Sequence, residues 1–419
     1  MRTHWRYALY GMPAFGLSIV GIPLYIYLPT FYTVELGMDV GRVGMILLIA
    51  RLLDMAFDPL MGFMSDHTRS AFGKRKPWIV LGACLLLVGY YGLINPPHER
   101  FLALWLFGFS LLTYLGLSGV SVPYMALSAE ISYAYHDKSF IASSREVLGI
   151  IGMITALALP YALDISQTPS LTLQTLYTLL LISLPLGVAL MCLGVREHSN
   201  TEESLSFMAA LPLLKHRRVS LLLIAYLLNT LANAIPSTLF LYFVSFVLQD
   251  SAQSGLLLML YFISGIAGLP FWLWLSVKIG KPHAWMASML FCTLSFAYVP
   301  FLGAGDTSVF TLIVLASGLC LGADLTLSTS LQADLAQTYE GEKTPLSGVL
   351  FGLWSMCTNV SLALGVGISF GILGLLSFEP SAPNPASLLG ISLMYGLLPV
   401  LLKLVSSFFV YRCYTLPTN

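Results

Sequence analysis

Three ionisable residues lie within an otherwise apolar stretch, and their types and spacing could hold a cation. Arg51, Asp54 and Asp58 are three and four positions apart, which places them on one face of an α-helix. Ionisable groups inside an apolar helix are costly, so they usually pair with each other or line a path for ions. Two carboxylates one turn apart repel unless a cation or a shared proton lies between them. The stretch therefore predicts a site for a cation or a shared proton.

The composition of the chain indicates a membrane protein. Its 419 residues are 57% hydrophobic and 10% charged, with a mean hydropathy of +0.82, whereas a soluble domain carries about a quarter charged residues. A formal net charge of zero gives no indication of a nucleic-acid partner. The six cysteines show no metal-binding spacing. No cofactor or metal is expected beyond a possible Na⁺ at Asp54 and Asp58.

A spanning helix needs about 20 mostly apolar residues, and twelve segments meet that requirement. They are 7–33, 41–65, 77–95, 101–131, 140–164, 172–195, 219–249, 253–278, 283–303, 307–337, 346–375 and 387–411. The polar segment 196–218 divides them six and six. We predict an all-α polytopic membrane protein with an N-terminal six-helix bundle over 1–195, a cytoplasmic central loop over 196–218 and a C-terminal six-helix bundle over 219–419.

The distribution of Lys and Arg predicts the orientation. With both termini in the cytoplasm, fifteen of these residues lie on the cytoplasmic side and two, Arg42 and Arg100, on the other. This asymmetry follows the positive-inside rule. We therefore expect a multi-pass protein of a bacterial inner membrane.

The two halves share sequence features. Gly21-Ile22-Pro23 matches Ala234-Ile235-Pro236, and Ala129-Glu130 matches Ala333-Asp334, at offsets of 213 and 204 residues. A near-constant offset of half the chain indicates a duplicated unit. Two pseudo-symmetric six-helix bundles are the architecture of many secondary transporters.

One long motif carries a resemblance to a known family. The stretch from Asp58 to Trp78, with Asp58-Pro59, Gly62, Asp66 and Gly73-Lys74-Arg75-Lys76-Pro77-Trp78, resembles the signature of the glycoside–pentoside–hexuronide:cation symporters. These are the melibiose-permease-like branch of the major facilitator superfamily. The segment Val122-Pro123-Tyr124 to Glu130 resembles that family's fourth helix, and the likeness extends over all twelve helices. It implies the twelve-helix major facilitator fold.

The resemblance also implies roles for single residues. Asp54 and Asp58 match the two carboxylates that bind the coupling cation, and Arg51 and Arg145 would hold them when no cation is bound. The sequence departs from the family at its sugar-binding carboxylates, where Ser18 and Ser121 stand instead. We therefore expect a neutral or amphipathic solute rather than a galactoside. The residues predicted to line its cavity are Ser18, Tyr25, Ser121, Tyr124, Asn229, Asn233, Asp324, Trp354 and Asn359.

Further residues are expected to serve gating between conformations or anchoring in the membrane. The predicted gating residues are Gly62, Asp66, Gly73, Lys74, Arg75, Glu130 and Asp334. Lys403 is interpreted as a side chain that extends to the cytoplasmic interface. Asp324 has two interpretations, a cavity-lining acid and a buried acid that is hydrogen-bonded to a neighbouring helix.

These observations predict a secondary active transporter that works by alternating access. Its expected activity is Na⁺- or H⁺-coupled symport of a small organic solute by a monomer in the lipid bilayer. The alternatives are a proton-driven exporter or antiporter of an amphipathic metabolite, siderophore or drug, a sodium-coupled lysolipid transporter, and a non-transporting solute sensor. An enzyme is not expected, because the sequence shows no nucleophile–base pair or phosphate-binding loop.

Overall fold

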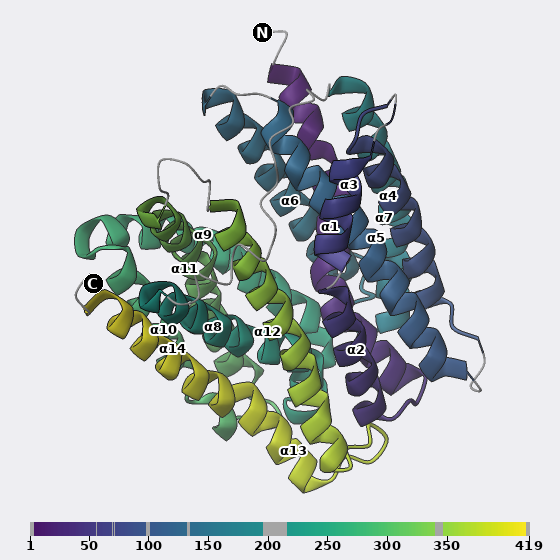
Figure 1. Ribbon diagram of the computed structural model, residues 1–419. Helices are drawn as coiled ribbons and strands as arrows, with labels where there is room; N and C mark the ends of the chain where they lie inside the picture. Colours follow the sequence, from purple (N-terminus) through teal and green to yellow (C-terminus); the bar gives the residue numbers. More distant parts are fainter. Residues whose placement is uncertain are drawn as a thin grey trace. The chain divides into compact units, whose positions relative to one another are not determined.

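The computed structural model describes residues 4–55, 57–68, 70, 72–97, 101–131, 135–195, 216–339 and 347–415. Helices and short turns account for these residues, and this part of the chain contains no β-strand (Figure 1). Eleven helical stretches are long and apolar enough to cross a membrane. The segment that holds α2 and α3 supplies the twelfth. The predicted all-α fold with twelve spanning segments is confirmed.

The helices fall into two compact units. The first unit holds α1 (His4–Thr30), η1 (Phe31–Glu35), most of α2 (Val40–Asp54), α3 (Phe57–His67), α4 (Lys76–Ile94), α5 (Leu102–Ile131), α6 (Tyr135–Ala162) and α7 (Pro169–Gly194). The second holds Asp39–Gly44, α8 (Arg217–Tyr242), η4 (Phe243–Val247), η5 (Ser251–Gln253), α9 (Ser254–Ile279), α10 (Lys281–Phe296), η6 (Val299–Phe301), α11 (Thr307–Tyr339), α12 (Ser347–Leu375), α13 (Pro385–Ser392), η7 (Leu393–Leu397) and α14 (Leu398–Thr415). Of the predicted central loop, 196–215 lie outside the described residues.

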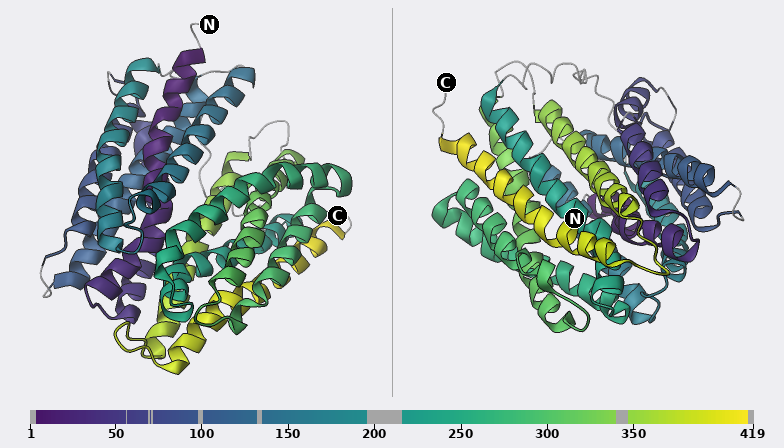
Figure 2. Two further views of the ribbon diagram at one scale, coloured as in Figure 1. Left: turned by 180° about the vertical axis from the view of Figure 1, so that it is seen from behind. Right: turned by 90° about the horizontal axis from the view of Figure 1, so that it is seen from below.

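The two units pack their helices by the same scheme. In the first unit α1 packs against α6 and α7, α5 against α3 and α4, and α4 also against α7. In the second unit α8 packs against α12 and α14, α11 against α9 and α10, and α10 also against α14. The yellow α14 lies along the teal α8 in the right view of Figure 2. Each contact in one unit thus has its counterpart six spans later in the other, as a duplicated six-helix bundle requires.

The duplication extends to an irregular piece of backbone. A π-helical turn ends the first helix of each unit, beginning at Phe31 in η1 and at Phe243 in η4, which are 212 positions apart. The second residue after each turn has a left-handed backbone, with φ of 67° at Gly37 and 56° at Gln249. A π turn is rare and is usually maintained for a reason. Its recurrence at one position in both halves supports the internal repeat.

The predicted helix 41–65 is wrong as one continuous helix. It divides into α2, which ends at Asp54, and α3, which begins at Phe57. Pro59 has no amide hydrogen to donate to the carbonyl of Met55, which weakens the helix there. Proline alone does not break the helix, because Pro270 at the matching position lies inside the unbroken α9. The two segments differ in charge, since α9 has no Asp, Glu, Lys, Arg or His before Lys278.

Glycines allow α9 and α11 to approach closely. A Cβ atom added at Gly322 would lie 2.5 Å from the carbonyl oxygen of Gly265, whereas one added at Gly371 in α12 would meet nothing within 4 Å. We expect Gly322→Ala to reduce stability by about 1–3 kcal/mol, because the two backbones must move apart. Gly371→Ala is the matched control and should unfold at the wild-type temperature. Equal unfolding temperatures for both variants in detergent would contradict this packing.

Candidate functional site

An ion pair lies buried in the first unit at the end of α2. The Arg51 guanidinium is 3.0 Å from a carboxylate oxygen of Asp54, and the two residues are only 8% and 4% exposed. The Ser118 hydroxyl on α5 donates a hydrogen bond of 3.3 Å to the other Asp54 oxygen. A buried charge is tolerated only when it is paired and hydrogen-bonded. The predicted association of Arg51 with Asp54 is therefore present in the structure.

Two tyrosines enclose the guanidinium of Arg51. Its central carbon lies 5.2 Å from the ring centroid of Tyr25 on α1 and 4.8 Å from that of Tyr114 on α5. Both distances fall within the range of cation–π attraction. The Tyr25 hydroxyl is buried without a hydrogen-bond partner among the described residues. Such a group indicates a place where a water molecule or an ion could bind.

Asp58 lies on the other side of the helix break. It occupies the first turn of α3 and is partly exposed, and both Arg51 and Asp54 lie within electrostatic range of its carboxylate. The carboxyl end of α2 presents backbone carbonyls at the same place, and a helix C-terminus favours a cation. Broken membrane helices supply ion ligands of this kind in several transporters. We name Arg51, Asp54, Asp58, Ser118 and Tyr25 the helix-2 cluster.

Arg145 is not part of the helix-2 cluster. Its guanidinium Nη2 lies 2.5 Å from the carboxylate of Glu146, its neighbour on α6. The resemblance implied a contact with Asp54 and Asp58, but in this conformation the described partner is local. In this conformation Arg145 is not grouped with Asp54 and Asp58.

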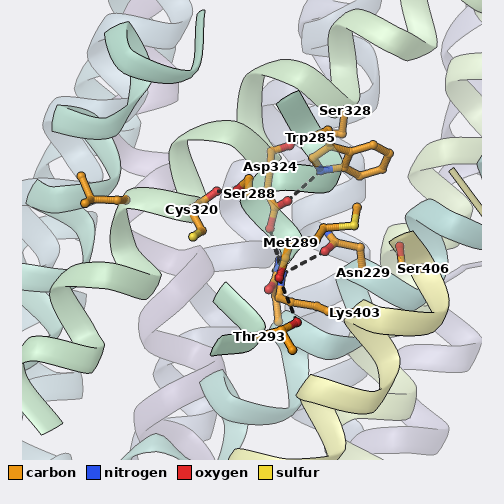
Figure 3. A network of polar contacts seen from close by, with 12 residues as sticks. Asn229, Trp285, Ser288, Met289, Thr293, Cys320, Asp324, Ser328, Lys403 and Ser406 are labelled. Atoms are coloured by element: carbon orange, nitrogen blue, oxygen red, sulfur yellow. Dashed lines mark hydrogen bonds and ion pairs between the residues drawn. The ribbon is translucent and has the colours of Figure 1, made fainter. Parts of the chain in front are cut away.

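A second charged network lies within the second unit (Figure 3). Asp324 on α11 accepts a hydrogen bond of 2.8 Å from the Trp285 indole. It accepts another of 2.8 Å from the Asn233 amide. The Lys403 ammonium on α14 lies 3.3 Å from the same carboxylate and donates a 2.9 Å hydrogen bond to Asn229. Four helices, α8, α10, α11 and α14, therefore converge on one acid. We name these five residues the Asp324 cluster.

The interpretation that the Lys403 side chain extends to the cytoplasmic interface is wrong. This residue is 3% exposed, and its ammonium pairs with Asp324, 79 positions away in the sequence. A signal for the pair is present in the chain: Asp324 and Lys403 are the two opposite charges deep inside the apolar segments of the second half. Opposite charges within membrane helices usually pair with each other. One of the two interpretations of Asp324 expected hydrogen bonds to a neighbouring helix, and such bonds are present in the structure.

The predicted cavity residues are divided between the two units. Tyr124 is 2% exposed. Its hydroxyl donates a hydrogen bond of 2.7 Å to the Tyr10 carbonyl, and its own carbonyl accepts one of 2.8 Å from the Tyr10 hydroxyl. Tyr124 therefore joins α1 to α5. Trp354 is also buried, and its indole nitrogen has no partner among the described residues. Ser18, Ser121 and Asn359 are partly exposed, and the Ser121 hydroxyl donates to the Leu117 carbonyl.

The predicted gating residues form contacts at helix ends. Arg75 is buried and donates a 2.7 Å hydrogen bond to the Ser65 hydroxyl, which fixes the turn between α3 and α4. Gly73 in that turn has a φ of 102°, a value that favours glycine. In the second unit Lys281 pairs with Asp334 at 2.6 Å. Gly62 and Lys74 are partly exposed, whereas the side chains of Asp66 and Glu130 lie outside the described part of the structure.

Among the described residues, no three His, Cys, Asp or Glu side chains are grouped closely enough to hold a metal ion. The helix-2 cluster offers carboxylates, a hydroxyl and helix-end carbonyls, which are ligands suited to Na⁺ or to a proton and not to a transition metal.

Comparisons with known proteins assign the chain to a family. A model of the MFS/sugar transport protein family matches residues 9–418. An uncharacterized symporter of Synechocystis sp. is 32% identical over 158 residues, which is 36% of this chain and 29% of that protein. The glucuronide carrier protein homolog of Escherichia coli is 22% identical over 89% of this chain and 84% of its own length.

A solved structure shows the same fold. The crystal structure of the nucleoside transporter NupG, as its D323A mutant, has a TM-score of 0.71 over 98% of this chain and 99% of its own, at 16% identity. Together with the repeated six-helix packing and the family match over nearly the whole length, this confirms the resemblance. The chain belongs to the MFS/sugar transport protein family of the major facilitator superfamily.

Proposed function

We propose that this protein is a cation-coupled symporter of a small neutral or amphipathic organic solute, and that the helix-2 cluster binds the coupling cation. The observation that carries the proposal is the buried Arg51–Asp54 pair at the break between α2 and α3, with Asp58 in range of both. Family membership supports transport, and the symporter relatives support coupling. The proposal places the protein in a bacterial inner membrane as a monomer with both termini in the cytoplasm.

The cluster suits a charge-exchange mechanism. Arg51 neutralises Asp54 while no coupling ion is bound, and the rings of Tyr25 and Tyr114 hold the guanidinium. A Na⁺ ion or a proton that arrives at Asp54 and Asp58 competes with Arg51 for the carboxylates. The ion thereby changes which conformation is more stable, and a ligand shifts a conformational equilibrium only through such a difference in affinity. Bound solute would add a second difference of this kind.

The test uses purified protein in sealed proteoliposomes and a panel of radiolabelled solutes. The panel contains a methyl glucuronide, the neutral disaccharide isoprimeverose, a nucleoside and a lysophospholipid. We expect at least one solute to accumulate inside only when an inward Na⁺ or H⁺ gradient is imposed. Equilibration that ignores both gradients would exclude coupling, and gradient-driven loss of a preloaded solute would favour the exporter alternative.

A further inference from the structure

The Asp324 cluster has one sealed side and one open side. Lys403, Asn229 and Trp285 are 3%, 2% and 0% exposed. Asn233 and Asp324 are partly exposed, and the Asp324 side chain is more exposed than that of Lys403, at 10% against 4%. The polar network therefore reaches the surface of its unit through the Asn233–Asp324 edge.

That edge must face water or a polar solute. All four contributing helices are apolar enough to span a membrane, and a carboxylate or amide that met the hydrocarbon would be strongly destabilising. Packing against apolar side chains would carry the same cost. A solute pathway is the environment within a transporter in which such an edge is stable.

The hydrogen bonds around the acid divide the residues by role. Trp285 and Lys403 contact Asp324 from the sealed side, and Asn229 holds the Lys403 ammonium. Asn233 donates one amide hydrogen to Asp324, which leaves its carbonyl oxygen and second amide hydrogen for another partner. The buried residues Trp285, Lys403 and Asn229 position the Asp324 carboxylate. The exposed edge presents the oxygens of Asp324 and Asn233 as hydrogen-bond acceptors and the second amide hydrogen of Asn233 as a donor.

We propose that Asn233 and Asp324 form a solute-binding edge for the hydroxyl or amino groups of a neutral polar solute. Lys403 is the positioning residue that compensates the charge of Asp324, so the cluster has no net charge. An anionic solute therefore gains no net electrostatic attraction there. This inference deepens the proposed transport function and rests on it. It removes Asn229 from the predicted cavity and adds Lys403 and Trp285 as supports.

The first experiment tests whether a water-soluble thiol reagent reaches position 233 but not position 229. Asn233→Cys and the matched control Asn229→Cys are placed in vesicles of both orientations and treated with a membrane-impermeant cationic methanethiosulfonate. Wild-type protein gives the background of its six native cysteines. We expect Asn233→Cys to gain one labelled site in at least one orientation and Asn229→Cys to gain none. Failure to label Asn233→Cys, or equal labelling of both variants, overturns the open edge.

Protection by solutes tests the ligand class. Isoprimeverose, a nucleoside and a methyl glucuronide are each added before the reagent. We expect a neutral member to slow the labelling of Asn233→Cys several-fold, whereas protection by the glucuronide alone, or by no solute, overturns the assignment. Labelling does not depend on a coupling ion, so a failure of the helix-2 cluster to bind cations leaves this result interpretable.

Variants that remove the charges of Asp324 and Lys403 test whether this pair contributes to solute binding or only to stability. Lys403→Met and Asp324→Asn should each lower the unfolding temperature, because each leaves one buried partner uncompensated. The double variant Asp324→Asn/Lys403→Met should unfold near the wild-type temperature while solute protection in the Asn233→Cys background is lost. A purely structural pair would retain protection in the double variant, and that outcome would overturn the binding role of Asp324.

Discussion

Replacing Asp54 with asparagine should reduce cation-driven solute accumulation by at least about 100-fold. Changes to residues that merely support an ion ligand already cost about 10–100-fold, and Asp54 is proposed to contact the ion itself. Asparagine keeps the size and the hydrogen bond from Ser118 but removes the charge with which Arg51 and the cation compete. The measurement is solute uptake into proteoliposomes with and without an imposed gradient.

Two controls accompany this variant. Asp306→Asn makes the same acid-to-amide change at an exposed turn, where the side chain caps Gly303, and it should transport like wild type. Exchange of labelled solute at equilibrium needs no gradient, so it reports whether the Asp54→Asn protein still folds and moves. Full cation-driven accumulation by Asp54→Asn would show that this carboxylate is not required for coupling.

Replacing Arg51 with methionine should lower stability by about 3–5 kcal/mol when no coupling cation is present. Methionine fills much of the space between the Tyr25 and Tyr114 rings but leaves the Asp54 carboxylate buried without its guanidinium. Removing one partner of a buried ion pair has a cost of this size. The measurement is the unfolding temperature in detergent without added sodium.

A rescue experiment separates charge from packing in the same site. The double variant Arg51→Met/Asp54→Asn no longer carries the buried pair, so it should recover most of the lost stability. If the double variant is as unstable as Arg51→Met alone, lost packing against the tyrosines explains the defect. That result would contradict an electrostatic role for Arg51.

The sequence was informative where local spacing determines the structure. The twelve apolar segments depend on composition, and the Arg51–Asp54 pair depends on a contact within one helical turn. The duplication was visible as matching residues at a near-constant offset. The break between α2 and α3 was missed because a proline does not by itself end a helix, as Pro270 in α9 demonstrates.

Contacts between distant segments were not predicted. The Asp324–Lys403 pair depends on how α11 and α14 pack, and no spacing rule connects positions 79 residues apart. Arg145 was assigned by resemblance, and its described partner is the adjacent Glu146. Tyr124 was assigned by residue type, although its ring and hydroxyl serve the α1–α5 contact.

Cation binding at the helix-2 cluster can be measured directly, without a solute. Thermal unfolding of the purified protein would be followed with and without sodium at two pH values, for wild type and for Asp58→Asn. We expect sodium or the lower pH to stabilise the wild type and the variant to lose this response. A wild type that responds to neither condition, or a variant that responds as the wild type does, would contradict cation binding at the helix-2 cluster.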